Sequence, residues 1–238
     1  MPEKSQQIIV NSEKLCKFRR IILEWGRKNI LDYPWRRTRD PYRILIAEML
    51  LHRTRSEQVV PLYLEFVKRF PTVIELSQAD YEEIVRILRS AGLSWRIRNI
   101  YEMAREVTAR FGGKIPEEYD DLMSLPGVSD YIASAVRCFA FGYPEPLLDT
   151  NTVRIAGRVF GLRITDSSRK SKKFRKLMEL LVDRDDPRMF NYSFVDFGKL
   201  VCRARNPLCH KCPAMNICEY HMKVSNEGFA TQMTGVMK

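Results

Sequence analysis

Residues 125–151 read LPGVSDYIASAVRCFAFGYPEPLLDTN, and the fold is organised around this stretch. It joins two helical patterns through the tight apolar turn LPGVS at residues 125–129. Gly127 allows the backbone in this turn to adopt conformations that other residues avoid. A second helix is expected over residues 130–141, and the apolar segment after it ends at Asp149. The stretch therefore predicts two helices joined by a short turn, followed by a single acid that emerges from a buried segment.

Both features of this stretch have a structural and a functional interpretation. The turn can aim backbone N–H groups and the start of a helix at an anion such as phosphate, although Pro-Gly between helices is also a common simple turn. Asp149 can cap a helix over residues 152–160, or its carboxylate can support bond cleavage at a sugar. Asn151 is expected to share the cap or to orient Asp149. The two roles of Asp149 are compatible with each other.

The charge balance predicts a polyanionic partner. The chain of 238 residues has 40 Lys plus Arg against 29 Asp plus Glu, a net charge of +11. Charge alone does not separate nucleic acid from a membrane surface or an acidic protein. The longest apolar runs, such as residues 45–51, are too short to cross a bilayer, and residues 1–11 lack the pattern of an export leader. We therefore expect a chain that stays inside the cell and has no membrane partner.

The hydrophobic pattern is helical along nearly the whole chain. Leu15, Phe18, Ile22 and Trp25 recur at helical spacing, for example, and no stretch shows the two-residue alternation of a strand. The sequence therefore predicts an all-α protein with short connections. Residues 223–238 have little periodicity and are expected to be frayed or disordered.

Four of the six cysteines form a metal-binding pattern near the end of the chain. The spacing is C-x6-C-x2-C-x5-C, at Cys202, Cys209, Cys212 and Cys218. Four thiolates from one loop can hold a [4Fe–4S] cluster or a tetrahedral zinc ion. Zinc sites usually pair two C-x2-C knuckles, and only one is present, so the spacing favours iron–sulfur. Cys16 and Cys138 lie in apolar helical contexts and are expected in the core.

Together with the upstream turn and Asp149, this cysteine pattern resembles the helix-hairpin-helix DNA glycosylases of the endonuclease III superfamily that carry an iron–sulfur cluster. The resemblance extends over residues 15–220. It implies a six-helix barrel over residues 33–142 that contains the hairpin. It also implies a discontinuous helical cluster domain, formed by residues 1–32 and 143–222, with residues 223–238 as a tail.

The resemblance further implies a cofactor, a partner and a set of site residues. The cofactor is a [4Fe-4S] cluster on the four clustered cysteines, and the partner is double-stranded DNA that contains a mismatched base. The hairpin residues that would bind the DNA backbone are Gly127, Val128 and Ser129. Ser129 stands where the family usually has a second glycine, and its hydroxyl can cap the following helix. A cytoplasmic, nucleoid-associated monomer is expected.

Tyr131 bears on the type of reaction. Family members that also cut the strand have a lysine where this chain has Tyr131, and no lysine occurs between residues 115 and 168. A Schiff base with the sugar is therefore not available from this segment. The resemblance implies a monofunctional glycosylase that uses water as nucleophile. Asp149 would be the catalytic carboxylate, which stabilises the sugar cation and orients or deprotonates the water, and Tyr131 would line the base pocket.

Two further stretches, PWRRTRDPY at residues 34–42 and AEMLLHRT at residues 47–54, indicate one branch of this superfamily. They are similar to the branch shared by archaeal thymine/uracil–guanine mismatch glycosylases and MutY-type adenine glycosylases. In that branch the glutamate matching Glu48 faces the flipped base and assists its departure, and burial would favour its protonated form. The alternative for Glu48 is a solvated surface residue.

The base preference is predicted from two differences with the adenine enzymes. Those enzymes carry Gln-Gln-Thr-Gln where this chain has His52-Arg53-Thr54-Arg55, and they have a further C-terminal domain for which no room is left after the cysteines. Both differences favour T·G and U·G mismatches. Arg53 matches the position beside the orphaned guanine, His52 is a candidate phosphate contact, and Tyr192 is a candidate wedge.

Two other functions are compatible with these motifs. The first is a MutY-like adenine glycosylase, and the second is a non-catalytic iron–sulfur DNA-binding protein. The presence of both Glu48 and Asp149 favours an enzyme, because a binding protein has no use for two acids that face DNA.

Overall fold

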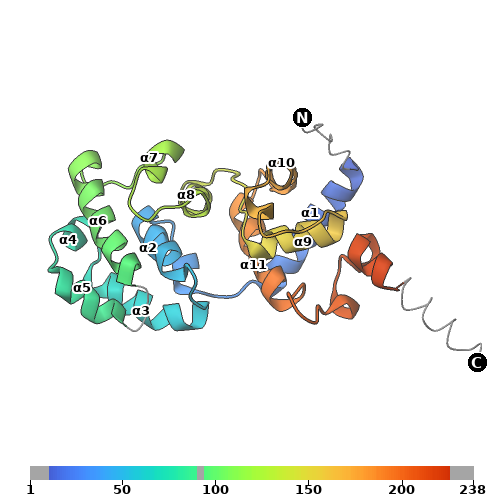
Figure 1. The fold of residues 1–238 in the computed structure, drawn as a ribbon, viewed down its shortest axis with the longest axis horizontal. Coiled ribbons are helices and arrows are strands. Elements are labelled where there is room, and N and C mark those ends of the chain that lie inside the picture. Colours follow the sequence, from blue (N-terminus) through green and yellow to red (C-terminus); the bar gives the residue numbers. More distant parts are fainter. Residues whose placement is uncertain (1–10, 90–93, 226–238) are drawn as a thin grey trace, which may run out of the picture. The chain divides into compact units, whose positions relative to one another are not determined.

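The computed structural model describes residues 11–89 and 94–225. This part of the chain contains helices and turns and no strand, which confirms the all-α prediction (Figure 1). Most of the expected tail, residues 226–238, and the polar start of the chain, residues 1–10, lie outside the described residues. No helix in the described part is both long and apolar enough to span a membrane.

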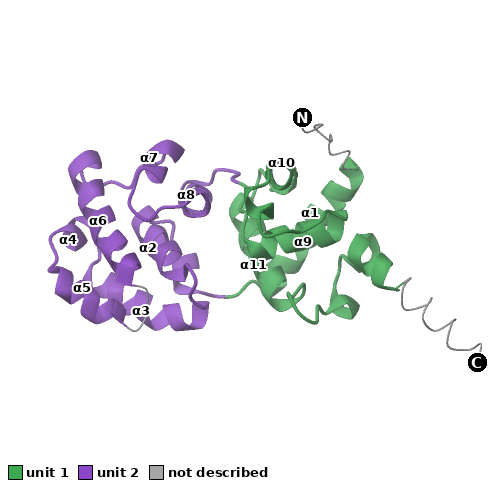
Figure 2. Ribbon diagram, viewed as in Figure 1, with its two compact units in different colours: residues 1–31, 146–238 green, residues 32–145 purple. Residues whose placement is uncertain are grey.

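The chain divides into two compact units (Figure 2). The first, here called the terminal unit, is formed by residues 1–31 and 146–238 from the two ends of the chain. The second, here called the central unit, is formed by residues 32–145. Asp149 and the clustered cysteines therefore belong to the terminal unit, and the hairpin, Glu48 and Arg53 belong to the central unit.

The central unit is built around one buried helix. Its helices are η1 (Pro34–Arg36), α2 (Pro41–Leu51), α3 (Ser56–Arg69), α4 (Val73–Ser77), α5 (Tyr81–Leu88), α6 (Ser94–Phe111), α7 (Tyr119–Met123) and α8 (Asp130–Val136). Helix α2 begins where the Asp40 side chain caps it and Pro41 occupies the first helical position. Residues 44–50 of α2 are all buried, because α3, α6 and α8 pack around this helix. A helix that is apolar on all sides can be stable only in such a position.

The turn between α7 and α8 has the geometry that its sequence predicts. Val128 donates its N–H to the Leu125 carbonyl (3.1 Å), and Gly127 has a φ of +78°. The Ser129 hydroxyl caps α8 by accepting the Ile132 N–H (3.4 Å). After Val136 the helix continues as a π-helical turn at Arg137–Phe141 and ends at Gly142. The prediction of a helix over residues 130–141 is therefore confirmed, with a wider last turn.

The terminal unit joins the first helix of the chain to the last ones. Its helices are α1 (Ser12–Asn29), α9 (Thr150–Phe160), η4 (Ser168–Lys170), α10 (Lys172–Leu181), α11 (Pro187–Leu200), η5 (Cys209–Lys211) and η6 (Met215–Ile217). Helix α1 packs along α11. The rings of Phe18 and Phe194 meet edge to face, with their centroids 5.8 Å apart. Gly26 allows this close approach, because a β-carbon there would lie 1.7 Å from the Ser193 hydroxyl. The core of this unit therefore depends on both chain ends.

The two cysteines outside the cluster differ from each other. Cys138 is buried, as predicted, but Cys16 is exposed, so the expectation that Cys16 lies in the core is wrong. The buried face of α1 follows Leu15, Phe18, Ile22 and Gly26. Cys16 comes one residue after Leu15, about 100° around the helix, and therefore points away from this face.

Candidate active site and cysteine-loop site

Asp149 is held at the start of α9 through both carboxylate oxygens. Its Oδ1 accepts the Thr152 N–H (2.7 Å), and its Oδ2 accepts the side-chain amide of Asn151 (2.9 Å). The Asp149 N–H donates to the Thr152 hydroxyl (2.9 Å), which completes a capping box. The positive end of the α9 dipole favours a negative charge at this place. The carboxylate is half-buried and fixed in orientation, so it serves as a cap and remains suited to act on a neighbouring positive centre.

Arg154 connects this carboxylate group to the cysteine loop. Its Nη2 donates to the side-chain oxygen of Asn151 (3.0 Å) and to the Gly198 carbonyl (2.8 Å), and its Nε donates to the Cys202 carbonyl (2.9 Å). Burial is the main reason why the pKa of Arg154 is lowered from its usual value. Asn151 therefore lies between Asp149 and a guanidinium that reaches the first clustered cysteine. No local pattern points to this role of Arg154, because Gly198 and Cys202 lie more than forty residues later in the chain.

The four clustered cysteines line one cavity of the terminal unit. The remaining lining is mainly apolar, and the whole set comprises Arg158, Val159, Phe197, Val201, Cys202, Pro207, Leu208, Cys209, Cys212, Met215, Cys218, Tyr220 and His221. Arg158 braces the loop, because its Nη1 donates to the Arg203 carbonyl (2.7 Å) and its Nη2 to the Ala204 carbonyl (3.0 Å). Its Nη1 also lies 3.5 Å from the Cys202 sulfur. The predicted ligand set therefore converges on one space.

Burial affects three of the four clustered thiols. Burial raises the pKa of Cys212 to about 12 and also raises the pKa values of Cys209 and Cys218. Within residues 11–89 and 94–225, no three or more Cys, His, Asp or Glu side chains are grouped in a way that could hold a metal ion. The loop thus gathers four thiols around a shared space without closing them on one point.

In the central unit, Glu48 is buried and Tyr131 is half-buried. Glu48 is 6% exposed and lies among the apolar residues of α2, so the alternative of a solvated surface glutamate is wrong. A buried carboxyl group is costly unless it is bonded or protonated, and this cost is typical of functional acids. Tyr131 lies in the first turn of α8, two residues after the Ser129 cap.

The hairpin requires glycine at its centre for two reasons. Gly127 has a positive φ, and a β-carbon there would lie 2.7 Å from the Asn99 β-carbon. A cavity of about 100 Å³ beside the hairpin is lined by Met49, His52, Trp95, Arg96, Asn99, Gly127, Ser129 and Ile132. His52 packs edge-on against Trp95, with ring centroids 5.5 Å apart. The candidate phosphate contacts His52 and Ser129 therefore border the same space, and Val128 beside them is buried.

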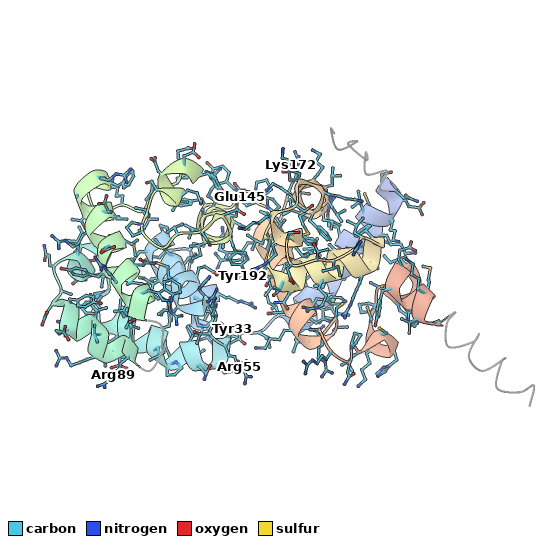
Figure 3. The ribbon with its side chains drawn as sticks, viewed as in Figure 1. Tyr33, Arg55, Arg89, Glu145, Lys172 and Tyr192 are labelled. Carbon is cyan, nitrogen blue, oxygen red and sulfur yellow. The ribbon has the colours of Figure 1, made fainter. Side chains whose placement is uncertain are left out.

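Arg53 and Tyr192 are the remaining predicted DNA contacts. Arg53 is exposed in the turn after α2. Tyr192 projects from α11 and is 5% exposed, with the Arg188 guanidinium 5.4 Å from its ring centroid (Figure 3). Insertion between bases would require this ring to leave its packed position, so the wedge role of Tyr192 stays a prediction.

The hairpin, the capped acid and the cysteine loop define a known class of protein. Residues 46–181, more than half of the chain, match the family described as HhH-GPD superfamily base excision DNA repair protein. The chain belongs to this family.

Individual relatives are similar over most of the chain. A thymine/uracil-DNA glycosylase of Pyrobaculum aerophilum is 40% identical over 87% of this chain and 93% of its own length. The structure of a thermostable thymine-DNA glycosylase has a TM-score of 0.83 and 35% identity, covering 89% of this chain and 98% of that one. An adenine DNA glycosylase of Buchnera aphidicola is 31% identical over 86% of this chain and 58% of its own length.

Proposed function

We propose that the protein is a monofunctional DNA glycosylase that removes thymine and uracil mispaired with guanine, in base excision repair. The observation that carries this proposal is the Asp149 carboxylate, which is held by Thr152 and Asn151 at the N-terminus of α9. A fixed anion of this kind stabilises the positive charge that develops on the sugar when the N-glycosidic bond breaks. The relatives named as thymine or thymine/uracil-DNA glycosylases support the same reaction and the same bases.

Some of the other site residues bind the DNA, and others take part in the reaction. The hairpin at Gly127, Val128 and Ser129 holds a phosphate, while His52 supports the backbone contact. Less free energy is needed to flip a mispaired base out of the stack than a paired one, and this difference contributes to selectivity. Glu48 then donates a proton or hydrogen bond to the departing base, and Tyr131 lines its pocket. Asp149, oriented by Asn151, assists the attack of water on the sugar.

The reaction is proposed to stop at the abasic site. Strand cutting through a Schiff base requires an amine beside the sugar. This chain has Tyr131 after the hairpin and no lysine between residues 115 and 168. A phenol cannot form an imine, and this difference supports hydrolysis as the proposed reaction.

The test of this function is base release from four labelled duplexes, which contain T·G, U·G, A·G or A·8-oxoguanine. Each is analysed with and without alkali. We expect release from T·G and U·G, with strand breaks only after alkali. Release from the adenine duplexes alone would assign the chain to the adenine glycosylases, and mismatch binding without release would make it a binding protein. Breaks without alkali, together with a borohydride-trapped complex, would overturn the absence of lyase activity.

A [4Fe–4S] cluster is proposed for the cysteine loop. A single zinc ion needs its four sulfurs about 2.3 Å from one point. The four cysteines share a cavity, yet they are not grouped around a point in this way. The cysteine spacing favours a cluster instead, because only one close C-x2-C pair is present where zinc sites usually have two. When bound, it supplies four iron–thiolate bonds that tie the loop together.

Metal analysis tests the cofactor. The purified protein is expected to contain about four irons per chain and to absorb light at about 410 nm. Cys212→Ser should lower both signals, because it removes one ligand. Cys16→Ser is the matched control, since Cys16 is an exposed thiol of the same unit outside the cavity. Zinc in place of iron, or equal losses in the two variants, would contradict the proposal.

A further inference from the structure

Arg53 has an unusual backbone conformation. Its φ is +61°, in the left-handed region where a β-carbon crowds the following carbonyl. Asn206 is the other residue besides glycine with a positive φ in the described part of the chain, and asparagine adopts this conformation far more readily than arginine. Such a conformation persists only when surrounding contacts hold it, and it is enriched at ligand-binding sites.

One buried side chain, Arg96 of α6, holds this turn, in addition to the bond from the Thr54 N–H to the Leu51 carbonyl (3.1 Å). Arg96 is 2% exposed and is among the largest fully buried side chains of the described residues. Its Nη1 donates to the Leu50 carbonyl and to the His52 carbonyl (3.2 Å), and both Nη atoms lie 3.1 Å from the Thr54 hydroxyl. These acceptors lie on both sides of Arg53 in the chain.

The chemistry of arginine suits this position. The last carbonyls of α2 have no partner within the helix. A cation at this end also interacts favourably with the negative end of the helix dipole. A guanidinium is planar and remains charged when buried, so it can bond to several acceptors at fixed angles. Burial lowers the pKa of Arg96 from its usual value, and the three acceptors offset this cost. A lysine ammonium carries the same charge, but it cannot bond to the Leu50 carbonyl, the His52 carbonyl and the Thr54 hydroxyl at the same time.

We propose that Arg96 is a positioning residue for recognition of the base opposite the excised one. It holds the turn at residues 50–54 so that Arg53 keeps its left-handed backbone and presents its guanidinium to guanine acceptors. The inference rests on the proposed function, because Arg53 reads guanine only in a mismatch enzyme. All of its contacts lie within the central unit.

Binding to a product analogue tests this role without requiring turnover. The probe is a duplex with a tetrahydrofuran abasic site opposite either guanine or adenine, and the measured quantity is the ratio of the two Kd values. The wild type should prefer guanine. Arg96→Lys should reduce this preference roughly tenfold, the size expected for one bidentate contact to a base. Thr54→Val, which removes one Arg96 acceptor with little change of volume, should reduce it in the same direction.

A double variant separates positioning from general support of the fold. Arg53→Gly removes the guanidinium and accommodates the positive φ, so it should lower the preference as Arg96→Lys does. If Arg96 acts through Arg53, adding Arg96→Lys to Arg53→Gly causes no further loss of preference. Arg98→Lys is the control, because Arg98 is exposed on the same helix and pairs with Glu102.

Each result decides the inference. An unchanged ratio in soluble Arg96→Lys and Thr54→Val, losses that multiply in the double variant, or a wild type that binds both duplexes equally would overturn it. Failure of the proposed function is seen separately, as a wild type that releases neither thymine nor uracil opposite guanine.

Discussion

Asp149→Asn is expected to lower the rate of thymine and uracil release by about 10²- to 10⁴-fold. The substitution removes the negative charge that would stabilise the sugar in the transition state. It keeps the shape of the side chain, and asparagine caps a helix about as well as aspartate. The oxygen that accepts the Thr152 N–H is retained and only the bond from the Asn151 amide to Oδ2 is lost, so the fold and the affinity for mismatched DNA should change little. Single-turnover release from a T·G duplex and equilibrium binding to the same duplex measure the two quantities.

The chain offers a matched control in the same unit. Asp186 caps α11 by accepting the Met189 N–H (3.1 Å), so Asp186→Asn makes the same chemical change at another helix start. This variant should retain wild-type release. If Asp149→Asn releases bases normally, or if it loses binding and keeps turnover, Asp149 acts only as a cap.

Glu48→Gln is expected to lower base release by about 10²-fold or more, since a glutamine amide cannot transfer a proton to the leaving base. The two side chains have nearly the same volume, so the packing of α2 should survive the change. A substitution of nearly equal volume is necessary here, because Glu48 is only 6% exposed and a smaller side chain would leave a cavity. A thermal melt shows whether the fold is retained, and single-turnover release from T·G and U·G duplexes gives the rate.

Glu65→Gln is the corresponding control, at an exposed position of α3 in the central unit. It should leave both rates unchanged. A folded Glu48→Gln protein with the wild-type rate would mean that Glu48 is a structural acid, and the departure of the base would then need another donor.

Several features of this protein could be predicted from local sequence patterns. The helix after the hairpin, the need for Gly127 and the Ser129 cap depend on contacts a few residues apart, and the structure contains all of them. The burial of Glu48 also follows from its position in an apolar stretch that is too continuous for a surface helix. Cys16 shows the limit, because an apolar context did not reveal which side of α1 it occupies.

The sequence by itself determined the all-α class, the hairpin and the set of clustered cysteines, since helical periodicity, capping and ligand spacing act over short distances along the chain. Only the tertiary structure decided what the long buried side chains do. Arg96 meets the Leu50 carbonyl across 46 residues, and Arg154 meets the Cys202 carbonyl across 48 residues. A flexible guanidinium can reach many acceptors, and no local pattern selects one. Packing of the helices makes that selection, and with it the left-handed turn at Arg53 and the bonded path from Asp149 through Asn151 and Arg154 to Cys202.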